Sequence, residues 1–256
     1  MKVMNSLDGQ TVAITGAGQG IGRAIATKTL ELGGNVVAID LDAAGLDALQ
    51  AQAPERVMVV NGSVTDESLA TQTVDSAVAR FGALHGLVNN AGIIRPALIE
   101  KMTARQWQEV IDVHMTGSFY WLQAVGRHMI ARAKAGDTGI KAIVNISSDA
   151  ARKGGFGLIN YAAAKAGMLA MTMTAAREWG KHGIRTNSVC FGAVETEMTE
   201  TIRSERLLPG LLAQIPLGYC APPEEVARAV CFLLSNGSAY ITGQHIGVNG
   251  GFHVSL

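Results

Sequence analysis

Residues 11–22 read TVAITGAGQGIG, an apolar β-branched run that passes directly into a glycine-rich turn. The run from Thr11 to Thr15 is typical of a buried strand, and the spacing of apolar residues from Gly20 to Leu32 predicts a helix after the turn. Glycines let the backbone approach a pyrophosphate closely, and free N–H groups at a helix start favour an anion. This order of strand, turn and helix therefore predicts a nucleotide-binding site.

The same alternation of apolar runs and helical patterns continues along the chain. Further runs of strand character cover residues 35–40, 56–60, 86–89, 141–147, 185–189 and 245–248. Their near-continuous hydrophobicity indicates parallel strands that are covered on both faces. We therefore expect an α/β fold in a single domain over residues 1–256, with a doubly wound seven-stranded parallel sheet and helices on both faces. Such sheets bind ligands beyond the carboxyl ends of their strands.

Composition limits the classes of partner. Of the 256 residues, 48% are hydrophobic and 16% are charged, and the formal net charge is zero. A large core is thus expected, without the bulk charge that attracts nucleic acid or an anionic membrane. Cys190, Cys220 and Cys231 follow no metal-binding spacing, so we expect no metal and buried thiols in a reducing cytoplasm. Residues 2–10 hold no secretory core segment, and no run has the roughly 18 apolar residues of a membrane-spanning helix.

Asp40 closes the second apolar run and bears on the choice of nucleotide. An acid at this place accepts from both hydroxyls of an adenosine ribose and repels a 2′-phosphate. The neighbouring Leu41 and Asp42, and Gln19 in the glycine turn, offer no cation to such a phosphate. The sequence therefore predicts NAD in preference to NADP. The alternative is that Asp40 only caps a turn.

Tyr161 and Lys165 lie four residues apart at the start of a predicted helix from Tyr161 to Gly180, so their side chains share one face. A nearby cation lowers the pKa of a phenol from its ordinary value of about 10. A tyrosine adjusted in this way exchanges protons near neutral pH. The spacing also occurs by chance in surface pairs. Beside a nucleotide site, with Ser148 earlier in the chain, it predicts a proton-transfer centre.

These residues together make the chain resemble the short-chain dehydrogenase/reductase family, in its 3-oxoacyl-carrier-protein-reductase-like branch. The glycine turn matches the family's cofactor motif, residues 89–92 (NNAG) match its second signature, and Ser148, Tyr161 and Lys165 match its catalytic residues. The resemblance implies a Rossmann fold with Tyr161 as general acid and base. It also implies that Ser148 polarises the substrate oxygen, and that Lys165 holds the nicotinamide ribose and lowers the pKa of the tyrosine. Relatives are usually tetramers, so a homotetramer is expected.

The resemblance also implies a set of binding residues. Those expected to bind the cofactor are Gly16, Gln19, Gly20, Ile21, Gly22, Asp40, Ser63, Val64, Asn89, Ala91, Gly92, Tyr161, Lys165, Gly192, Val194, Thr196 and Met198. Those expected to contact the substrate are Arg95, Ala150, Phe156 and Phe191. The stretch from Phe191 to Pro223 predicts a substrate lid, with an ordinary surface loop as the alternative. Asn90 is expected to tie strand ends together.

The chain departs from the family pattern at four positions. His114 stands where the family usually has an asparagine that holds a water linking the catalytic lysine to solvent. An imidazole can hold such a water and can titrate near neutral pH, so His114 is a catalytic candidate. The alternative is a packing change. The other departures are Ser63 for an aspartate beside adenine, Phe191 for a proline, and Tyr219 for an arginine.

The sequence thus predicts an NAD(H)-dependent oxidoreductase, an alcohol dehydrogenase or ketoreductase that interconverts a small-molecule secondary alcohol and a ketone. The alternative is a 3-oxoacyl-(acyl-carrier-protein or CoA) reductase. Phe191, Tyr219, the long stretch 131–141 and the predicted preference for NAD argue mildly against it, since that biosynthetic reduction commonly uses NADPH. A remote alternative, supported only by His114, is a nucleotide-sensing protein that no longer turns over.

Overall fold

β1 (Thr11–Thr15) is a short β-branched strand whose residues are all buried, as expected of a strand covered on both faces. In the computed structural model, which describes residues 5–254, β1 pairs in parallel with β2 (Asn35–Asp40) and β4 (Gly86–Asn89). The sheet has seven parallel strands in the order β3-β2-β1-β4-β5-β6-β7. Its other strands are β3 (Val57–Asn61), β5 (Ala142–Ser148), β6 (Arg185–Phe191) and β7 (His245–Val248). The predicted doubly wound parallel sheet is confirmed, and its strand order reverses between β1 and β4.

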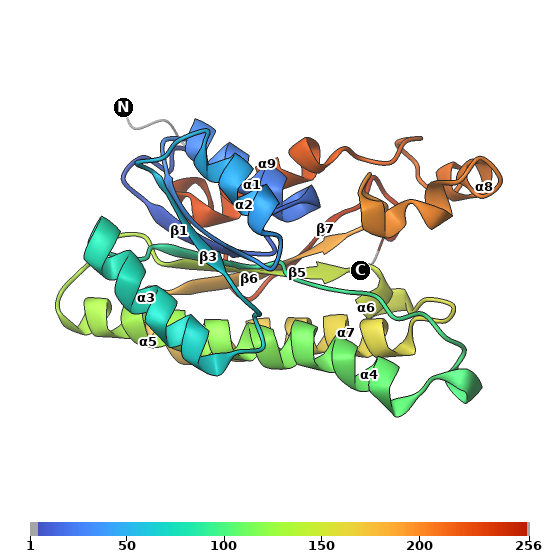
Figure 1. Cartoon of the computed structure of the whole chain (residues 1–256), viewed down its shortest axis with the longest axis horizontal. Helices are drawn as coiled ribbons and strands as arrows, with labels where there is room; N and C mark the ends of the chain where they lie inside the picture. The colour runs from blue at the N-terminus through green and yellow to red at the C-terminus, as the bar shows by residue number, and fades with distance from the viewer. Residues whose placement is uncertain (1–4, 255–256) are drawn as a thin grey trace.

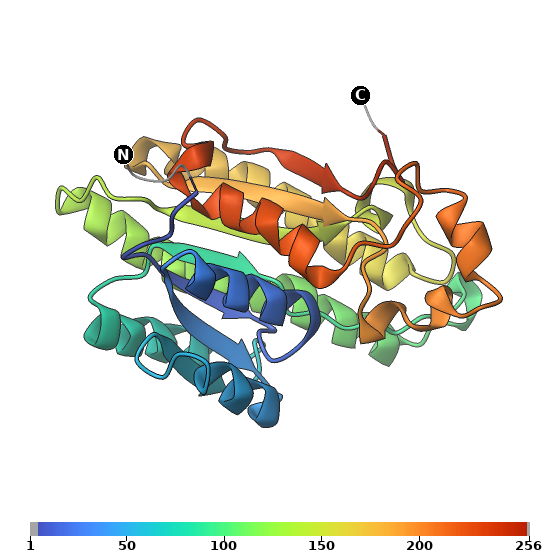
Figure 2. The ribbon, with the colours of Figure 1, turned by 90° about the horizontal axis from the view of Figure 1, so that it is seen from above.

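Helices cover both faces of the sheet (Figures 1 and 2). One face carries α1 (Gly20–Glu31), α2 (Ala43–Gln50) and α9 (Pro223–Leu234). The other carries α3 (Glu67–Phe81), α4 (Ala104–Ile111), α5 (Ser118–Lys134) and α7 (Ile159–Trp179). Short 3₁₀ turns lie at η1 (Ile99–Lys101), η3 (Gly180–His182) and η6 (Asn236–Ser238). A π-helix, η2 (Asp112–Gly117), joins α4 to α5. The structure describes no helix that is long and apolar enough to span a membrane.

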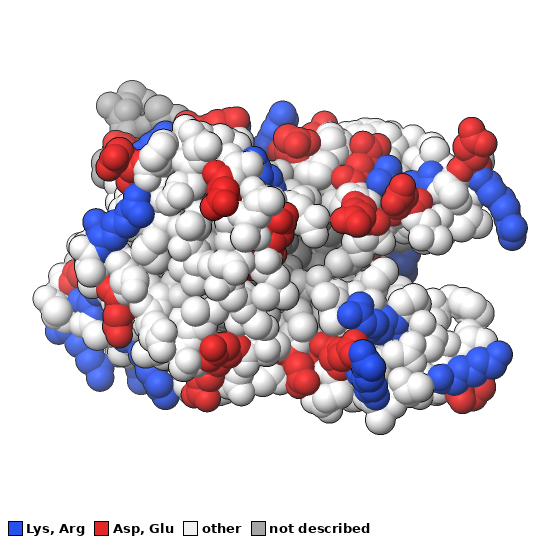
Figure 3. Space-filling view, in the orientation of Figure 1, with Lys and Arg blue, Asp and Glu red and all other residues white. Residues whose placement is uncertain are grey.

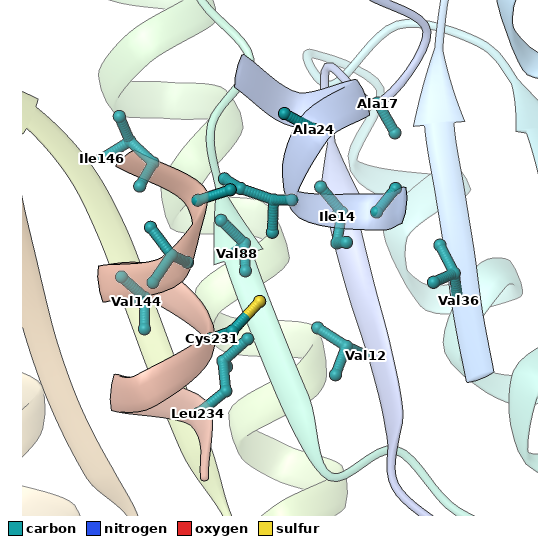
Figure 4. Packing of buried hydrophobic residues seen from close by; sticks show 14 of the residues in the cluster. Val12, Ile14, Ala17, Ala24, Val36, Val88, Val144, Ile146, Cys231 and Leu234 are labelled. Atoms are coloured by element: carbon teal, nitrogen blue, oxygen red, sulfur yellow. The ribbon is translucent and has the colours of Figure 1, made fainter. Parts of the chain in front are cut away.

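The alternation of side chains along β1 supplies two cores. Val12 and Ile14 pack under α1 and α9, together with Cys231 and Leu234 of α9 (Figure 4). Ala13 faces the opposite layer, where it joins a cluster that contains the fully buried Trp121 of α5. Fully burying one large apolar side chain contributes roughly 1.5–3 kcal/mol. Packing on both faces of the sheet therefore fixes the carboxyl ends of its strands.

The predicted lid stands apart from the layered body. After β6 the chain forms η4 (Glu197–Thr199), η5 (Thr201–Arg203) and α8 (Leu208–Leu212). These turns enclose a small apolar cluster of their own, built on the buried Ala193, Ile215 and Cys220. In Figure 1 this segment lies above the end of the sheet, opposite α4 and α6 (Ala150–Lys153). Figure 3 shows that the surface is hollowed between these two parts, at the right of the view.

Candidate active site

A cavity of about 820 Å³ lies at the carboxyl ends of the strands and spans the switch point between β1 and β4. Its wall includes residues of the segment after β6, such as Thr196, and of the segment after β4, such as Arg95. Most of the predicted site residues line it. They are Gly16, Gln19, Gly20, Ile21, Gly22, Asp40, Ser63, Val64, Ala91, Gly92, Arg95, His114, Ser148, Tyr161, Lys165, Phe191, Gly192, Val194, Thr196 and Met198.

The glycine turn has a shape that only glycine permits. Gly16 and Gly20 adopt positive φ angles of 68° and 53°. A Cβ atom at Gly22 would lie 1.8 Å from the carbonyl oxygen of Gly16. α1 begins at Gly20, and the residue before it makes no side-chain cap, so the first amides of the helix remain available to a ligand. These features fit the diphosphate of a dinucleotide.

Asp40 lies at the end of β2 with its carboxylate turned toward the glycine turn. Its Oδ2 accepts from the Gly18 N–H at 2.8 Å, and its Oδ1 accepts from the Asp42 N–H at 3.0 Å. A carboxylate has further acceptor sites, so both capping and ribose binding are open to it. Among the described residues that line the cavity, the lysine and arginine side chains are those of Lys165 and Arg95. Both lie on segments far from Asp40, beyond β5 and β4 respectively.

Neighbouring asparagines at the end of β4 have different places. Asn89 is buried and donates to Asn145 Oδ1 at 2.9 Å and to the Ser118 carbonyl at 3.3 Å. It does not line the cavity, so the predicted contact between Asn89 and the cofactor is not supported by its position. Asn90 does line the cavity, and its Nδ2 donates to the carbonyls of Thr15 and Gly16. It thus ties β4 to β1, as predicted.

Ser148, Tyr161 and Lys165 converge at the opposite end of the cavity from the glycine turn. Ser148 ends β5, where its Oγ accepts from the Ala150 N–H at 3.2 Å. Tyr161 and Lys165 lie in the first turns of α7, which packs against β5 and β6. The Nζ of Lys165 donates to the Ile146 carbonyl at 2.7 Å and lies 5.7 Å from the centre of the Tyr161 ring. A hydroxyl, a phenol and an amine therefore meet at one point.

Burial shifts the pKa of both helix residues. Burial raises the pKa of Tyr161, and a hydrogen bond with the Ser148 hydroxyl opposes this rise. Burial lowers the pKa of Lys165 to about 7, since the charged ammonium loses its hydration. The predicted lowering of the tyrosine pKa by Lys165 is not borne out, because burial dominates and the opposing contribution comes from Ser148 rather than from Lys165. Tyr161 is therefore a protonated phenol at neutral pH.

His114 lies in the π-helix η2, with 1% of its surface exposed. Its Nε2 is 3.0 Å from the Ile93 nitrogen and 2.8 Å from the Ile93 oxygen. Its Nδ1 has no hydrogen-bond partner among the described residues. Burial, and then the charge of Lys165, lowers the pKa of His114 to about 3. The prediction that His114 titrates near neutral pH is therefore wrong, whereas its binding of a water stays a prediction.

Two of the four residues predicted to contact the substrate line the cavity, and two do not. Arg95 lines the cavity, with its Nε donating to Glu109 Oε2 at 2.7 Å, and Phe191 lines it beside Ser148, its partner across the sheet. Ala150 and Phe156 do not line the cavity. The Phe156 side chain is 94% exposed, because the glycine-flanked loop that carries it turns it to solvent. Ala150 instead supports Ser148 through its backbone N–H.

Some lining residues had no clear sequence signal. The cavity wall also contains Ile93, Val113, Ile146 and Ser147, and the lid adds Thr199. Thr199 Oγ1 is within hydrogen-bond distance of the carbonyls of Val194 and Thr196, which fixes the lid turn beside the cavity. Serine and threonine hydroxyls often close such local turns. That turn chemistry is the signal that could have identified Thr199.

Comparisons with known proteins agree with this geometry. The enoyl-(acyl carrier protein) reductase family model matches residues 16–253. A 3-oxoacyl-[acyl-carrier-protein] reductase of Thermotoga maritima is 40% identical over 248 residues, which cover 96% of this chain and 98% of that protein. A (3R)-3-hydroxyacyl-CoA dehydrogenase of Canis lupus familiaris is 36% identical over 252 residues, or 94% and 95% of the two chains. The crystal structure of a short-chain dehydrogenase/reductase from Brucella melitensis, described as a glucose/ribitol dehydrogenase, superposes with a TM-score of 0.90 at 32% identity over the whole of both chains.

A dinucleotide cradle that faces a serine, a tyrosine and a lysine across one cavity defines an NAD(P)-dependent oxidoreductase. The chain belongs to the short-chain dehydrogenase/reductase family and resembles its 3-oxoacyl-carrier-protein reductases.

Proposed function

We propose that this protein interconverts 3-oxoacyl and 3-hydroxyacyl thioesters with NAD(H), with Tyr161 as general acid and base. The convergence of Ser148, Tyr161 and Lys165 at one end of a cavity whose other end is a dinucleotide cradle supports the chemistry. Relatives named as 3-oxoacyl-carrier-protein reductases and as a 3-hydroxyacyl-CoA dehydrogenase match over nearly the full length. They favour the thioester substrate over the unactivated ketone that the sequence suggested first.

The cofactor preference rests on Asp40. Its carboxylate and that of Asp42 line the adenosine end of the cavity. The guanidinium of Arg23 is held nearby by the carbonyls of Gly18 and Gly45, but Arg23 does not line the cavity wall. A ribose with free hydroxyls offers two donors to such a site, whereas a 2′-phosphate adds two negative charges next to it. The site therefore favours NAD(H). This preference separates the chain from biosynthetic reductases that commonly use NADPH.

Reduction needs a proton source and a donor where charge develops on the substrate oxygen. NAD(H), when bound, supplies or accepts the hydride. The Ser148 hydroxyl, whose oxygen is already held by the Ala150 N–H, is oriented to donate its proton to the substrate oxygen. Tyr161 is protonated at neutral pH because burial raises its pKa, so it acts as the acid in reduction. Lys165, anchored on the Ile146 carbonyl, is placed to hold a ribose hydroxyl.

In the direction of oxidation the same phenol must first lose its proton. Because burial raises the pKa of Tyr161, the phenolate becomes abundant only in alkaline solution. Near neutral pH the site therefore holds Tyr161 in the protonated form that reduction needs.

A steady-state assay tests the function. Acetoacetyl-CoA is offered with NADH or NADPH, and 3-hydroxybutyryl-CoA with NAD or NADP. We expect turnover with the thioesters, with kcat/KM at least about tenfold higher for NADH than for NADPH. Comparable or better rates with NADPH would remove the cofactor assignment, and absence of thioester turnover would remove the substrate assignment.

The second candidate is an alcohol dehydrogenase for polyols or simple secondary alcohols. The Brucella melitensis protein described as a glucose/ribitol dehydrogenase, whose structure superposes along the whole chain, favours it. Ribitol and cyclohexanol in the same assay separate the two candidates, because a polyol dehydrogenase would oxidise them faster than 3-hydroxybutyryl-CoA. Any turnover above background excludes the remote alternative of a sensing protein without catalysis.

A further inference from the structure

Asp149, directly after Ser148, is a buried carboxylate that the proposed mechanism does not use. Only 2% of its surface is exposed. It precedes the short helix α6, yet its side chain makes no cap to that helix. Both carboxylate oxygens instead accept from Asn249 Nδ2, at 3.1 and 2.9 Å. The two residues are 100 positions apart in the chain, so this contact joins distant segments.

Asn249 is itself held firmly in the loop that follows β7. Its Nδ2 also donates to the His253 carbonyl at 2.9 Å, and its Oδ1 accepts from the Gly251 N–H at 3.0 Å. It packs against Gly192, the first lid residue after β6, where a Cβ atom would lie 2.8 Å from the Asn249 Cβ. Gly192 lines the cavity. The loop 249–253 therefore forms a fixed support behind the lid side of the active site.

Two further contacts join the turn that carries Ser148 to β6 and to the loop 249–253. The Asp149 N–H donates to the Phe191 carbonyl at 3.0 Å, which continues the pairing of β5 with β6. The Nζ of Lys153, at the end of α6, lies 3.2 Å from the centre of the Phe252 ring. A cation at this distance from a ring is attracted to it. The turn that carries Ser148 thus contacts the C-terminal loop at both of its ends.

We propose that Asp149 is a positioning residue, whose carboxylate ties the Ser148 turn to Asn249 and so fixes the Ser148 hydroxyl opposite Gly192 and Phe191. This role rests on the proposed reductase activity, in which Ser148 contacts the substrate oxygen. A shift of about 1 Å in such a group can reduce turnover by about two orders of magnitude. A buried tie of this kind therefore bears directly on rate.

The hydrogen bond to Asn249, rather than the negative charge, carries the role. Arg152, Lys153 and His253 influence the Asp149 carboxyl only through space, as does Cys190 on β6, and no ion pair to Asp149 forms within residues 5–254. Burial raises the pKa of Asp149, so the charge itself is unfavourable at this site. An amide at position 149 would still accept from Asn249.

Two matched variants separate the hydrogen bond from the charge. In Asp149→Asn we expect kcat for acetoacetyl-CoA reduction within about twofold of the parent, since the acceptor is kept. In Asp149→Leu we expect kcat to fall about tenfold or more, with the affinity for NADH unchanged and the melting temperature no lower than the parent's. Parent-like kcat in Asp149→Leu would overturn the proposal. An equal loss in both variants would overturn it as well, because the charge would then be what matters.

A double-mutant cycle covers the case in which Asp149→Leu folds poorly. Asn249→Ala removes the same contact from the other side, and the variants Asp149→Ala and Asp149→Ala with Asn249→Ala complete the cycle. We expect Asn249→Ala and Asp149→Ala each to lower kcat about tenfold, and the double variant to lose no more than either single variant. If the two substitutions instead lower kcat by independent factors that multiply in the double variant, the proposed link between Asp149 and Asn249 is contradicted.

Amide hydrogen exchange separates failure of this inference from failure of the proposed function. The amides of residues 148–154 should exchange about tenfold faster in Asp149→Leu than in the parent or in Asp149→Asn. If the parent does not reduce acetoacetyl-CoA but exchange responds in this way, the substrate assignment fails while Asp149 still fixes the Ser148 turn. Unchanged exchange in Asp149→Leu would overturn the tie whatever the substrate.

Discussion

The rings of His114 and Tyr161 meet edge to face, with centroids 5.3 Å apart and planes at 88°. His114 also holds the Ile93 backbone, which lines the cavity. A neutral imidazole therefore supports Tyr161 and the adjoining cavity wall together. Because the pKa of His114 is lowered to about 3, its ring does not change charge in the range where the enzyme is assayed.

His114→Asn should retain most of kcat, since an amide can still bond the Ile93 backbone. Its pH profile between about pH 5 and pH 9 should match the parent's, because the buried histidine does not titrate there. His114→Leu should lose about tenfold in kcat, because the Ile93 backbone at the cavity wall loses its hydrogen bond to position 114. Profiles of kcat against pH for the three proteins check this. If kcat of the parent falls at low pH and kcat of His114→Asn does not, the imidazole does exchange protons.

Tyr161 should impose opposite pH behaviour on the two directions. The acid is present throughout the neutral range because burial raises its pKa, so Tyr161 should leave the reduction rate unchanged from about pH 6 to pH 9, and any change in that range reports Lys165, whose pKa is lowered to about 7. Oxidation needs the phenolate and should accelerate as pH rises across that range. Initial rates of acetoacetyl-CoA reduction and 3-hydroxybutyryl-CoA oxidation, each at saturating cofactor, measure the two profiles. An oxidation rate independent of pH would argue against Tyr161 as the base.

Asp40→Asn should weaken the preference for NADH over NADPH by about tenfold in kcat/KM. The amide oxygen still accepts from the Gly18 or Asp42 N–H, so the turn is kept while the repulsion of a 2′-phosphate is removed. Asp42→Asn is the matched control, since Asp42 lines the same end of the cavity. If both variants change the ratio equally, the preference comes from the general potential rather than from Asp40.

His85, at the opposite end of the sheet, should make the fold sensitive to acid. Its Nδ1 accepts from the Thr11 N–H at 3.1 Å, and burial, followed by the charge of Arg132, lowers its pKa from 6.5 to about 4. A pKa lower in the folded than in the unfolded state means that the unfolded chain binds the proton first. The stabilisation by neutral His85 is thus complete above about pH 6.5 and is lost as the pH falls toward about 4.

Thermal melts at pH 7.5 and pH 5 test this role of His85. His85→Asn keeps an acceptor for the Thr11 N–H but cannot titrate, so its melting temperature should fall less between the two pH values than the parent's. His182→Asn, a change in the turn η3 after α7, serves as the control because no hydrogen bond joins His182 to the Thr11 N–H, and it should keep the parent's acid sensitivity. Equal acid sensitivity of His85→Asn and the parent would contradict the assignment.

The regular part of the fold could be predicted because parallel strands are encoded in short local runs. β1, β2, β4 and β7 occupy the predicted residues. β3 and β5 begin and end one residue later than predicted, and β6 continues to Phe191 instead of residue 189, since Ser148 and Phe191 pair with each other across the sheet. That pairing depends on two segments far apart in the chain. The π-helix η2 was also absent from the prediction, because helical spacing of apolar residues does not distinguish it from an α-helix.

The glycine turn, Asp40 and the group of Ser148, Tyr161 and Lys165 could be located because each belongs to a motif of fixed spacing. The burial of Asn89 away from the cavity could not be predicted, because successive strand residues point to opposite faces and a shift of one position decides between the cavity and the core. The pKa values of His114 and Tyr161 depend on burial, which the sequence does not show. The contact of Asp149 with Asn249 depends entirely on tertiary structure. The homotetramer stays a prediction.

Transfer of deuterium from NADH tests the central claim most directly. NADH labelled with deuterium at both hydrogens of C4 is mixed with acetoacetyl-CoA and the protein, and the product is analysed by mass spectrometry. We predict 3-hydroxybutyryl-CoA with one deuterium at C3, formed about 10²–10⁴-fold more slowly by Tyr161→Phe although NADH still binds. Absence of labelled product from the parent protein, or equal rates for the parent and Tyr161→Phe, would contradict the account.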